Sequence, residues 1–313
     1  MNHSFIAYAL VNTAFALAFS PLFVSMIKKV KAFTQGRQGP PLLQFYYIIA
    51  KLFRKERVYS SNSSWLMRAT PYIVISSTLA ATLFVPFLFI PSPMAGIGKI
   101  ILLKYNLAAG RFFMALAGLD AGSTFGGMGS SREMSISAVI EPITIIAFAA
   151  LAFTLNTTSI HEMFERTSSS VPFLNPAVVL ISVSLFLILI VETARIPIDN
   201  PETHLELTMI HEAMLLEYSG RDLALMEVAH ALKQTLLMGI LINILLPFGL
   251  SQGLAAGGII VAAVLFIAKA SLLSVLVGLF ESSLAKFRLF SLPGLFAMVF
   301  FLSSVTILLE VFK

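Results

Sequence analysis

The stretch LNPAVVLISVSLFLILIVETA, residues 174–194, contains a single charged residue, Glu192. An α-helix needs about 20 mostly apolar residues to cross the hydrocarbon core of a bilayer, which is ~30 Å thick. This stretch therefore predicts a transmembrane helix, and seven others of similar length and character accompany it. The eight predicted spans are 5–27, 70–90, 99–119, 135–156, 174–194, 229–250, 256–280 and 290–311.

The composition of the whole chain agrees with a membrane location. Of the 313 residues, 58% are hydrophobic and 12% are charged, which is more apolar surface than one water-soluble core encloses. Backbone in lipid must satisfy its own hydrogen bonds, and continuous apolar runs favour helices over a barrel. We predict an all-α, polytopic membrane protein that forms one membrane domain over residues 1–313. The lack of cysteine excludes disulfides and thiolate-bound zinc or iron–sulfur clusters on this chain.

The distribution of Lys and Arg predicts the orientation. Nine of them lie between Lys28 and Arg68, whereas the loops on the opposite side carry little beyond Lys99 and Arg166. By the positive-inside rule both termini face outward, and the net charge of +5 reflects topology rather than nucleic-acid binding. The first apolar run reads as a retained helix, not a signal peptide. The predicted cytoplasmic loops are 28–69, 120–134, 195–228 and 281–289.

Two connections invite a more specific interpretation. Residues 42–53 interleave apolar and aromatic residues and end on basic ones, which predicts an interfacial amphipathic helix or, alternatively, an apolar loop anchored at the headgroups. The glycines of 122–129 are not followed by the Lys-Ser/Thr of a phosphate-binding loop. We interpret them as flexible backbone in a cytoplasmic connection.

Residues 195–227 hold seven of the chain's 16 acidic residues. Asn200 before Pro201 is typical of a helix start. If that helix runs unbroken, Glu202, Glu206 and Glu217 share a face, with His204 and His211 on the opposite one. Facing a cavity, such carboxylates would have raised pKa values and act as proton carriers. The alternatives are a solvated acidic loop that docks a basic partner and, more weakly, a metal site at the two histidines.

Charged residues also lie inside the predicted spans. Glu141, directly before Pro142, Glu192 and Lys269 predict an ion path, or else structural ion pairs. Lys104 and Arg111 stand seven residues apart and therefore on one face of a helix. For Lys104, near the end of its span, we expect the amine to reach the headgroup region. No Ser/His/Asp or Cys/His nucleophile arrangement is evident.

Three motifs together are similar to a known family. The first is Arg37-Gln-Gly-Pro40, followed by Leu43-Gln44 and Lys51-Leu52. The second is Arg132 followed nine positions later by Glu141. The third is Glu192-Thr-Ala-Arg-Ile-Pro-Ile-Asp-Asn-Pro-Glu202, followed by Glu217-Tyr-Ser-Gly. They resemble the membrane subunit shared by respiratory complex I, where it is called subunit 1, and the energy-converting group 4 NiFe hydrogenases. The string from Asp199 to Glu212 looks like the formate hydrogenlyase and membrane-bound hydrogenase type.

The resemblance implies eight helices and a cytoplasmic junction with a hydrophilic redox arm. It also implies an oxidoreductase complex in which this chain holds no cofactor, the NiFe centre and iron–sulfur clusters being on partner subunits. The expected partners are the hydrogenase large and small subunits, a ferredoxin-like iron–sulfur subunit, antiporter-like membrane subunits and the lipid bilayer. Departures after Gln44 and after Glu202 put quinone binding in doubt. A quinone-site subunit and a stand-alone ion transporter are the alternatives.

The functional residues fall into two expected sets. The proton pathway comprises Glu141, Glu192, Glu202, Glu206 and Glu217 by resemblance, with Asp199 and Lys269 added from their positions. The charge partners or junction contacts are Arg37, Arg132 and Arg195 by resemblance, with His204, His211 and Arg221 added from the acidic segment. We expect no catalytic residue and no metal ligand on this chain.

Overall fold

The computed structural model describes residues 3–89, 98–168, 175–200, 209–251, 253 and 255–312. Eight helices of 17 residues or more dominate it, and no strand occurs in these ranges. They are α1 (His3–Thr34), α3 (Trp65–Thr82), α4 (Ile100–Asp120), α5 (Thr124–Thr154), α7 (Pro176–Glu192), α9 (Gly220–Leu245), α10 (Ala256–Ser283) and α11 (Leu292–Val311). The short ones are α2 (Gln44–Arg54), α6 (Ile160–Ser168), α8 (His211–Leu215) and η2 (Leu289–Ser291). The all-α, polytopic fold is confirmed.

The long helices correspond one for one to the eight predicted spans. Within the described residues, six are long and apolar enough to cross a membrane, and α7 is a shorter apolar helix. The eighth, α3, contains Arg68 near its first turn. For residues 42–53 the alternatives were an amphipathic helix and an apolar loop, and the structure has a helix there, α2. Phe45 is the residue of α2 that is buried.

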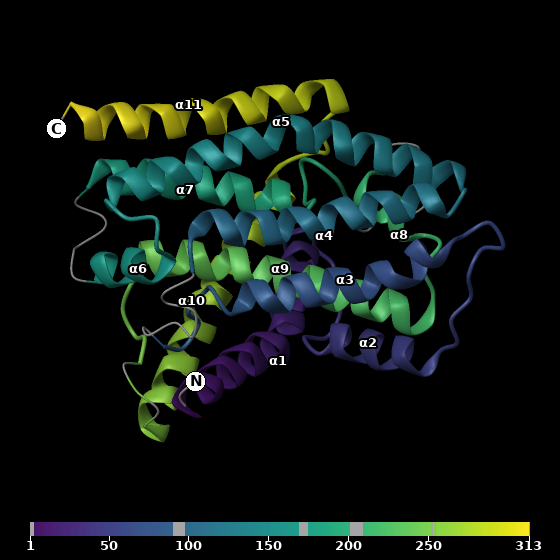
Figure 1. Ribbon diagram of the computed structural model, residues 1–313, viewed down its shortest axis with the longest axis horizontal. Coiled ribbons are helices and arrows are strands. Elements are labelled where there is room, and N and C mark those ends of the chain that lie inside the picture. Colours follow the sequence, from purple (N-terminus) through teal and green to yellow (C-terminus); the bar gives the residue numbers. More distant parts are fainter. Residues whose placement is uncertain are drawn as a thin grey trace.

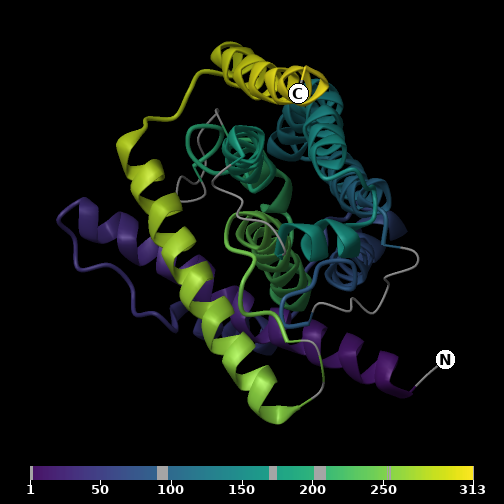
Figure 2. The ribbon, with the colours of Figure 1, turned by 90° about the vertical axis from the view of Figure 1, so that its left-hand side faces the viewer.

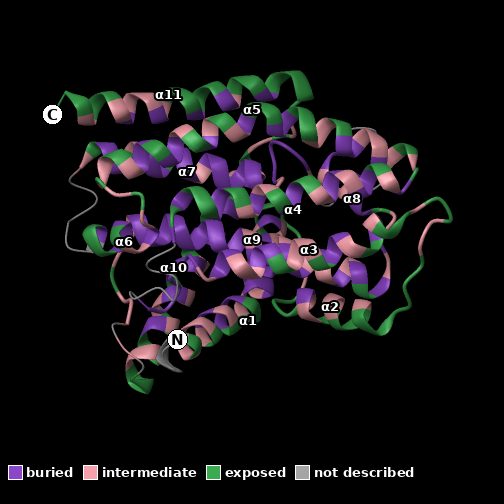
Figure 3. Cartoon of the chain, viewed as in Figure 1, coloured by how far each residue is buried: buried purple, intermediate pink, exposed green. Residues whose placement is uncertain are grey.

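Helix α9 forms the centre of the bundle. Nineteen of its 26 residues are buried, and it packs against α1, α2, α3 and α7 (Figures 1 and 3). α1 and α10 pack together and are tilted relative to α4 and α5, while α11 covers α5 and α7 (Figure 2). α2 and α8 lie at one end of the molecule, whereas α6 and both chain ends lie toward the other (Figure 1).

Two predicted spans end earlier as helices than expected. α3 stops at Thr82 and α9 at Leu245, and residues beyond each, 83–89 and 246–251, are irregular. Buried backbone needs hydrogen-bond partners, and Asn12 supplies them: its Nδ2 donates to Thr82 O and Val85 O at 3.1 and 3.0 Å, and its Oδ1 accepts from Phe87 N at 3.0 Å. Asn243 Nδ2 donates to Pro86 O at 2.6 Å. Protein amides thus replace the helical bonds at this depth.

The interpretation of the 122–129 glycines as a flexible loop is wrong. α5 begins at Thr124, so Gly126 and Gly129 are helical. A Cβ built on Gly129 would lie 2.8 Å from Ala213 Cβ and from Ile210 O. A Cβ on Gly126 would lie 2.5 Å from Gly118 O. These glycines allow α4, α5 and α8 to approach one another closely, which is a packing role.

The acidic segment is not one continuous helix. Pro201 to Thr208, with Glu202, His204 and Glu206, lies outside the described residues. After it, Met209 and Ile210 are not helical, α8 has five residues, and the turn at Leu216–Ser219 separates it from α9. Gly220 has φ +54, and a Cβ there would collide with the carbonyl oxygen of Glu56, so the chain turns sharply at a position that suits glycine. The condition for a single face through Glu206 and Glu217, an unbroken helix, is therefore not met between Met209 and Ser219.

Candidate functional site

Glu192 lies at the end of α7 and faces three cations from two other helices. Lys104 Nζ is 2.6 Å from its Oε1, Lys233 Nζ is 2.9 Å from its Oε2, and an Arg111 guanidinium nitrogen contacts Oε2 directly. Only 2% of the Glu192 side chain is exposed. The expectation that Lys104 reaches toward the headgroups is wrong, because a buried carboxylate is its partner. The shared face of Lys104 and Arg111 is confirmed, since both converge on Glu192.

Arg111 joins three carboxylates into one cluster. Besides Glu192, its guanidinium lies 3.6 Å from Glu133 and 3.6 Å from Glu141, both on α5, and donates to Ser137 Oγ at 3.1 Å. We call the six residues Lys104, Arg111, Glu133, Glu141, Glu192 and Lys233 the Arg111 cluster. Its three cations and three anions balance, which is how buried charges are tolerated at this depth. Sequence reasoning missed Glu133 and Lys233.

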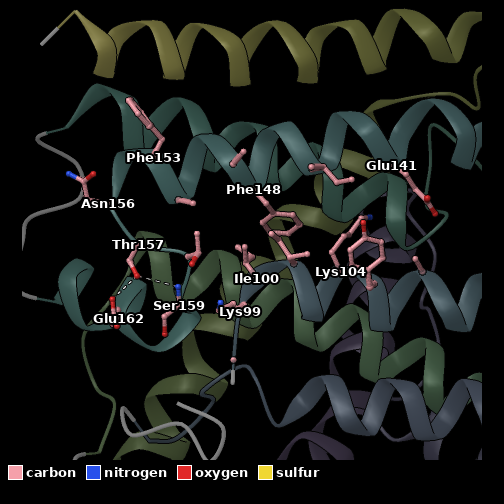
Figure 4. Close-up of a pocket in the computed structure, with 18 residues that line it drawn as sticks. Lys99, Ile100, Lys104, Glu141, Phe148, Phe153, Asn156, Thr157, Ser159 and Glu162 are labelled. Atoms are coloured by element: carbon pink, nitrogen blue, oxygen red, sulfur yellow. Dashed lines mark hydrogen bonds between the residues drawn. The ribbon is translucent and has the colours of Figure 1, made fainter. Parts of the chain in front are cut away.

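Glu141 is the most exposed member of the Arg111 cluster. Its side chain is 39% exposed and, with Lys104, lines a groove of about 970 Å³ between α4 and α5 (Figure 4). The groove extends from Glu141 toward Glu162 on α6, and its walls between them are mostly apolar. A partly exposed carboxylate on a membrane-spanning helix thus faces an apolar groove.

A second, smaller cavity of about 40 Å³ lies toward the α8 end. It is lined by Arg111, Glu133, Lys233 and two histidines, His211 on α8 and His230 on α9. The two imidazole rings are 4.9 Å apart between centroids and tilted by 52°. Sequence reasoning paired His211 with His204, but in the described residues its ring neighbour is His230. No group of three potential metal ligands occurs among the described residues.

Arg195, just beyond α7, belongs to a different buried cluster. It donates to Glu281 Oε1 at 2.6 Å and to Gln234 Oε1 at 2.5 Å, and Lys31 Nζ lies 4.0 Å from Glu281. This cluster ties the end of α7 to α1, α9 and α10. Arg195 is thus a buried charge partner, whereas Glu281 was not predicted.

Asp199 is a hub for the chain that leads into α8. Its carboxylate accepts from Lys286 Nζ at 2.8 Å and from the backbone N–H groups of Ile210 and His211, each at 3.0 Å. Only 1% of Asp199 is exposed. These bonds fix the start of α8 and so position His211.

The other predicted residues are spread along the molecule. Lys269 donates to the carbonyls of Leu246 (2.8 Å) and Phe248 beyond α9, and lies 4.2 Å from the Phe248 ring centroid. Lys269 therefore supplies hydrogen bonds to backbone carbonyls just beyond the end of α9. Within the described part of the chain, its hydrogen bonds do not involve the Arg111 cluster. Arg132 donates to Met209 O at 3.0 Å. Three residues lie near α2 or the α8–α9 turn: Arg37 and Arg221, both exposed, and Glu217, partly buried.

Two titratable groups of α8 have pKa values that depart from the ordinary. Burial raises the pKa of Glu212 to about 7, with a smaller rise from the charges of Glu227 and Asp199. Burial also lowers the pKa of His211, opposed by the negative charge of Glu133. A carboxyl group that titrates near neutral pH thus lies beside an imidazole that is neutral there.

The fold and these clusters define a polytopic helical membrane protein whose helices enclose a compensated group of charges. The family model described as NADH dehydrogenase matches residues 6–312, and the chain belongs to that family. The expected resemblance is confirmed.

Individual relatives narrow the type of complex. The chain is 34% identical to "Hydrogenase-4 component C" of Escherichia coli (strain K12), over 90% of this chain and 89% of that protein. It is 30% identical to "Formate hydrogenlyase subunit 4" of the same organism, over 91% and 92%. A subunit of the NADH-quinone oxidoreductase of Wolbachia pipientis wMel is 26% identical over 69% of each chain. This protein is a membrane subunit of a complex I-like, group 4 hydrogenase-type oxidoreductase complex.

The fold has a solved counterpart. A chain in the structure of the membrane-bound sulfane sulfur reductase, an archaeal respiratory membrane complex, superimposes with a TM-score of 0.86. The alignment covers 98% of this chain and 99% of that chain at 17% sequence identity. The arrangement of the helices is therefore shared by proteins whose sequences have diverged widely.

Proposed function

We propose that this chain is the junction subunit of an energy-converting NiFe hydrogenase complex in the cell membrane. It anchors the hydrophilic redox arm at the α2–α8 end and couples electron transfer and proton reduction to H⁺ or Na⁺ movement through buried glutamates. The observation that carries the proposal is the gathering of Glu133, Glu141 and Glu192 around Arg111 inside the bundle. Carboxylates that share one cation inside a protein respond strongly to a change in any neighbouring charge.

The relatives, which are hydrogenase and formate hydrogenlyase components by name, support the choice of partners. The large and small hydrogenase subunits and a ferredoxin-like iron–sulfur subunit would carry the NiFe centre and the clusters. An antiporter-like membrane subunit would cover the groove between α4 and α5. A charged side chain that faces lipid costs roughly 2.5–3.5 kcal/mol on insertion scales, so the partly exposed Glu141 favours a protein neighbour over lipid.

A quinone-site subunit of a complex I-like oxidoreductase is the second candidate, because more distant relatives carry quinone in their names. Such a subunit needs a long apolar tunnel beneath the loop that contains α2. The 970 Å³ groove is long and apolar, but it runs toward α6 and away from α2. Nickel in the purified complex would favour hydrogenase, and its absence together with quinone reduction would favour the alternative.

Exchange of Glu141 or Glu217 for glutamine tests the coupling role. The complex is purified intact and reconstituted in liposomes, and protons moved per electron are measured with a pH-sensitive dye. We expect a fall of about fivefold or more, because glutamine neither binds nor releases a proton. Glu165→Gln, on the exposed face of α6 with 65% of its side chain accessible, is the matched control. A wild-type ratio in both test variants would contradict the proposal.

A further inference from the structure

The histidine pair lies between α8 and the Arg111 cluster. His211 is the first residue of α8, directly before Glu212, and its backbone is held by Asp199. His230 belongs to α9, one helical turn before Lys233, which is bonded to Glu192. The ring of His211 therefore lies on the same element as Glu212, and the ring of His230 lies on the same helix as Lys233 of the Arg111 cluster.

The cavity that both rings line connects these two sides. With about 40 Å³ it holds at least one water molecule, and its polar lining offers that water several partners. Glu133 lines the same cavity and is held at 3.6 Å by Arg111, the cation that also contacts Glu141 and Glu192. A proton that reached Glu133 would therefore arrive within the Arg111 cluster.

Imidazole is suited to the intervening step. A neutral ring accepts a proton at one nitrogen and releases another from the second, so it passes a proton without a net change in charge. Burial lowers the pKa of His211 and favours this neutral form. Charged groups from several elements influence the pair: Arg111 of α4, Glu133 of α5, Asp199 and Arg195 beyond α7, Lys233 of α9 and Lys28 of α1. The α3 residues that line the cavity, Val74, Ser77 and Thr78, are uncharged.

We infer that His211 of α8, His230 of α9 and the water of their cavity conduct protons from the α8 end to Glu133 of the Arg111 cluster. The inference rests on the proposed coupling function and adds to it the route by which protons reach the buried carboxylates. In each step one O–H or N–H bond breaks as the next forms, so no electrons are exchanged and no further reactant is needed. Glu133 then acts as the carboxylate that receives the proton.

The test uses the intact complex in liposomes with His230→Gln. Glutamine keeps a hydrogen-bonding side chain but cannot relay a proton, and we expect protons moved per electron to fall at least fivefold. His161→Gln, on α6 and remote from the cavity, is the control and should match the wild type. If His230→Gln prevents assembly of the complex, His211→Gln on the short α8 gives the same measurement. A wild-type ratio in the assembled His variant would overturn the inference.

Chemical rescue separates conduction from a packing role. In His230→Ala, added imidazole should restore the ratio, whereas 1-methylimidazole, which cannot release a proton from its blocked nitrogen, should not. Restoration by both compounds would mean that the ring only fills space, and restoration by neither would also overturn conduction by His230. If Glu141→Gln lowers the ratio while the histidine variants do not, the proposed function stands and this route fails. If none of these variants lowers it, both fail.

Discussion

Glu212 shows how one residue of α8 responds to its surroundings. Burial and two neighbouring carboxylates raise its pKa to about 7, from an ordinary value of 4.5. The stability that the neutral carboxyl group contributes is fully present below about pH 4.5 and is lost as the pH rises through about 7. A difference of about 2.5 pKa units corresponds to at most about 3.4 kcal/mol.

We therefore expect Glu212→Gln, which stays neutral, to flatten the pH dependence of unfolding between pH 5 and 8. Thermal unfolding in detergent micelles at several pH values measures this pH dependence. As the pH rises, the variant should become more stable relative to the wild type. Glu165→Gln should follow the wild-type curve. Parallel curves for Glu212→Gln and the wild type would contradict a raised pKa for Glu212.

At the same scale, individual residues show what the sequence can predict. The seven-residue spacing of Lys104 and Arg111 predicted that both lie on one helical face. In the structure both side chains on that face form ion pairs with Glu192. Glu133 was missed because it fell in an expected loop, and Lys233 because it lay near a span boundary. A simple signal was available for Lys233: a lysine four residues inside a predicted span needs a partner. Which partner it has depends on tertiary packing, which spacing along one helix does not determine.

At the scale of elements, the close approach of α5 and α8 depends on Gly129. A methyl group there would meet Ala213 Cβ and Ile210 O at 2.8 Å, and backbone does not yield easily. We expect Gly129→Ala to destabilise the protein by about 1–3 kcal/mol and to loosen α8. Hydrogen exchange of residues 209–215 and thermal unfolding measure the two effects.

Gly127, two residues earlier on the same helix, provides the matched control. A Cβ at Gly127 meets nothing within 4 Å, so Gly127→Ala should stabilise α5 by up to about 1 kcal/mol through helix propensity. Opposite signs for two identical substitutions on one helix are the expected result. Equal effects would show that propensity, rather than contact with α8, decides the outcome.

Element boundaries were predicted less well than element number. Hydropathy identified all eight long helices because each is apolar over most of its length, where its side chains either pack inside the bundle or face lipid. It placed the starts of α5 and α9 too late, because Thr124–Met134 and Gly220–Val228 extend the helices beyond the apolar part. The glycine pattern of 122–129 predicted flexibility from local backbone freedom alone. Its role in packing depends on α8, which is far away in sequence.

At the scale of the whole molecule, two chemically different ends predict its orientation. α2 ends in the basic run Lys51, Arg54 and Lys55, followed by Arg57, and Arg221 lies beside it. The α6 end carries few cations, with Arg166 compensated by Glu162 on the same helix. Because Lys and Arg are retained on the cytoplasmic side during insertion, we expect the α2–α8 end inside and both chain ends outside.

The lack of cysteine makes this orientation directly testable. Ser61→Cys marks the α2–α3 loop and Glu165→Cys marks α6, and both positions are exposed. In inside-out vesicles stripped of soluble subunits, a membrane-impermeant maleimide should label Ser61→Cys and spare Glu165→Cys until detergent is added. Right-side-out vesicles should give the reverse. The opposite pattern would place the basic end outside, and the route through the histidine pair to Glu133 would then open to the wrong compartment for a cytoplasmic redox arm.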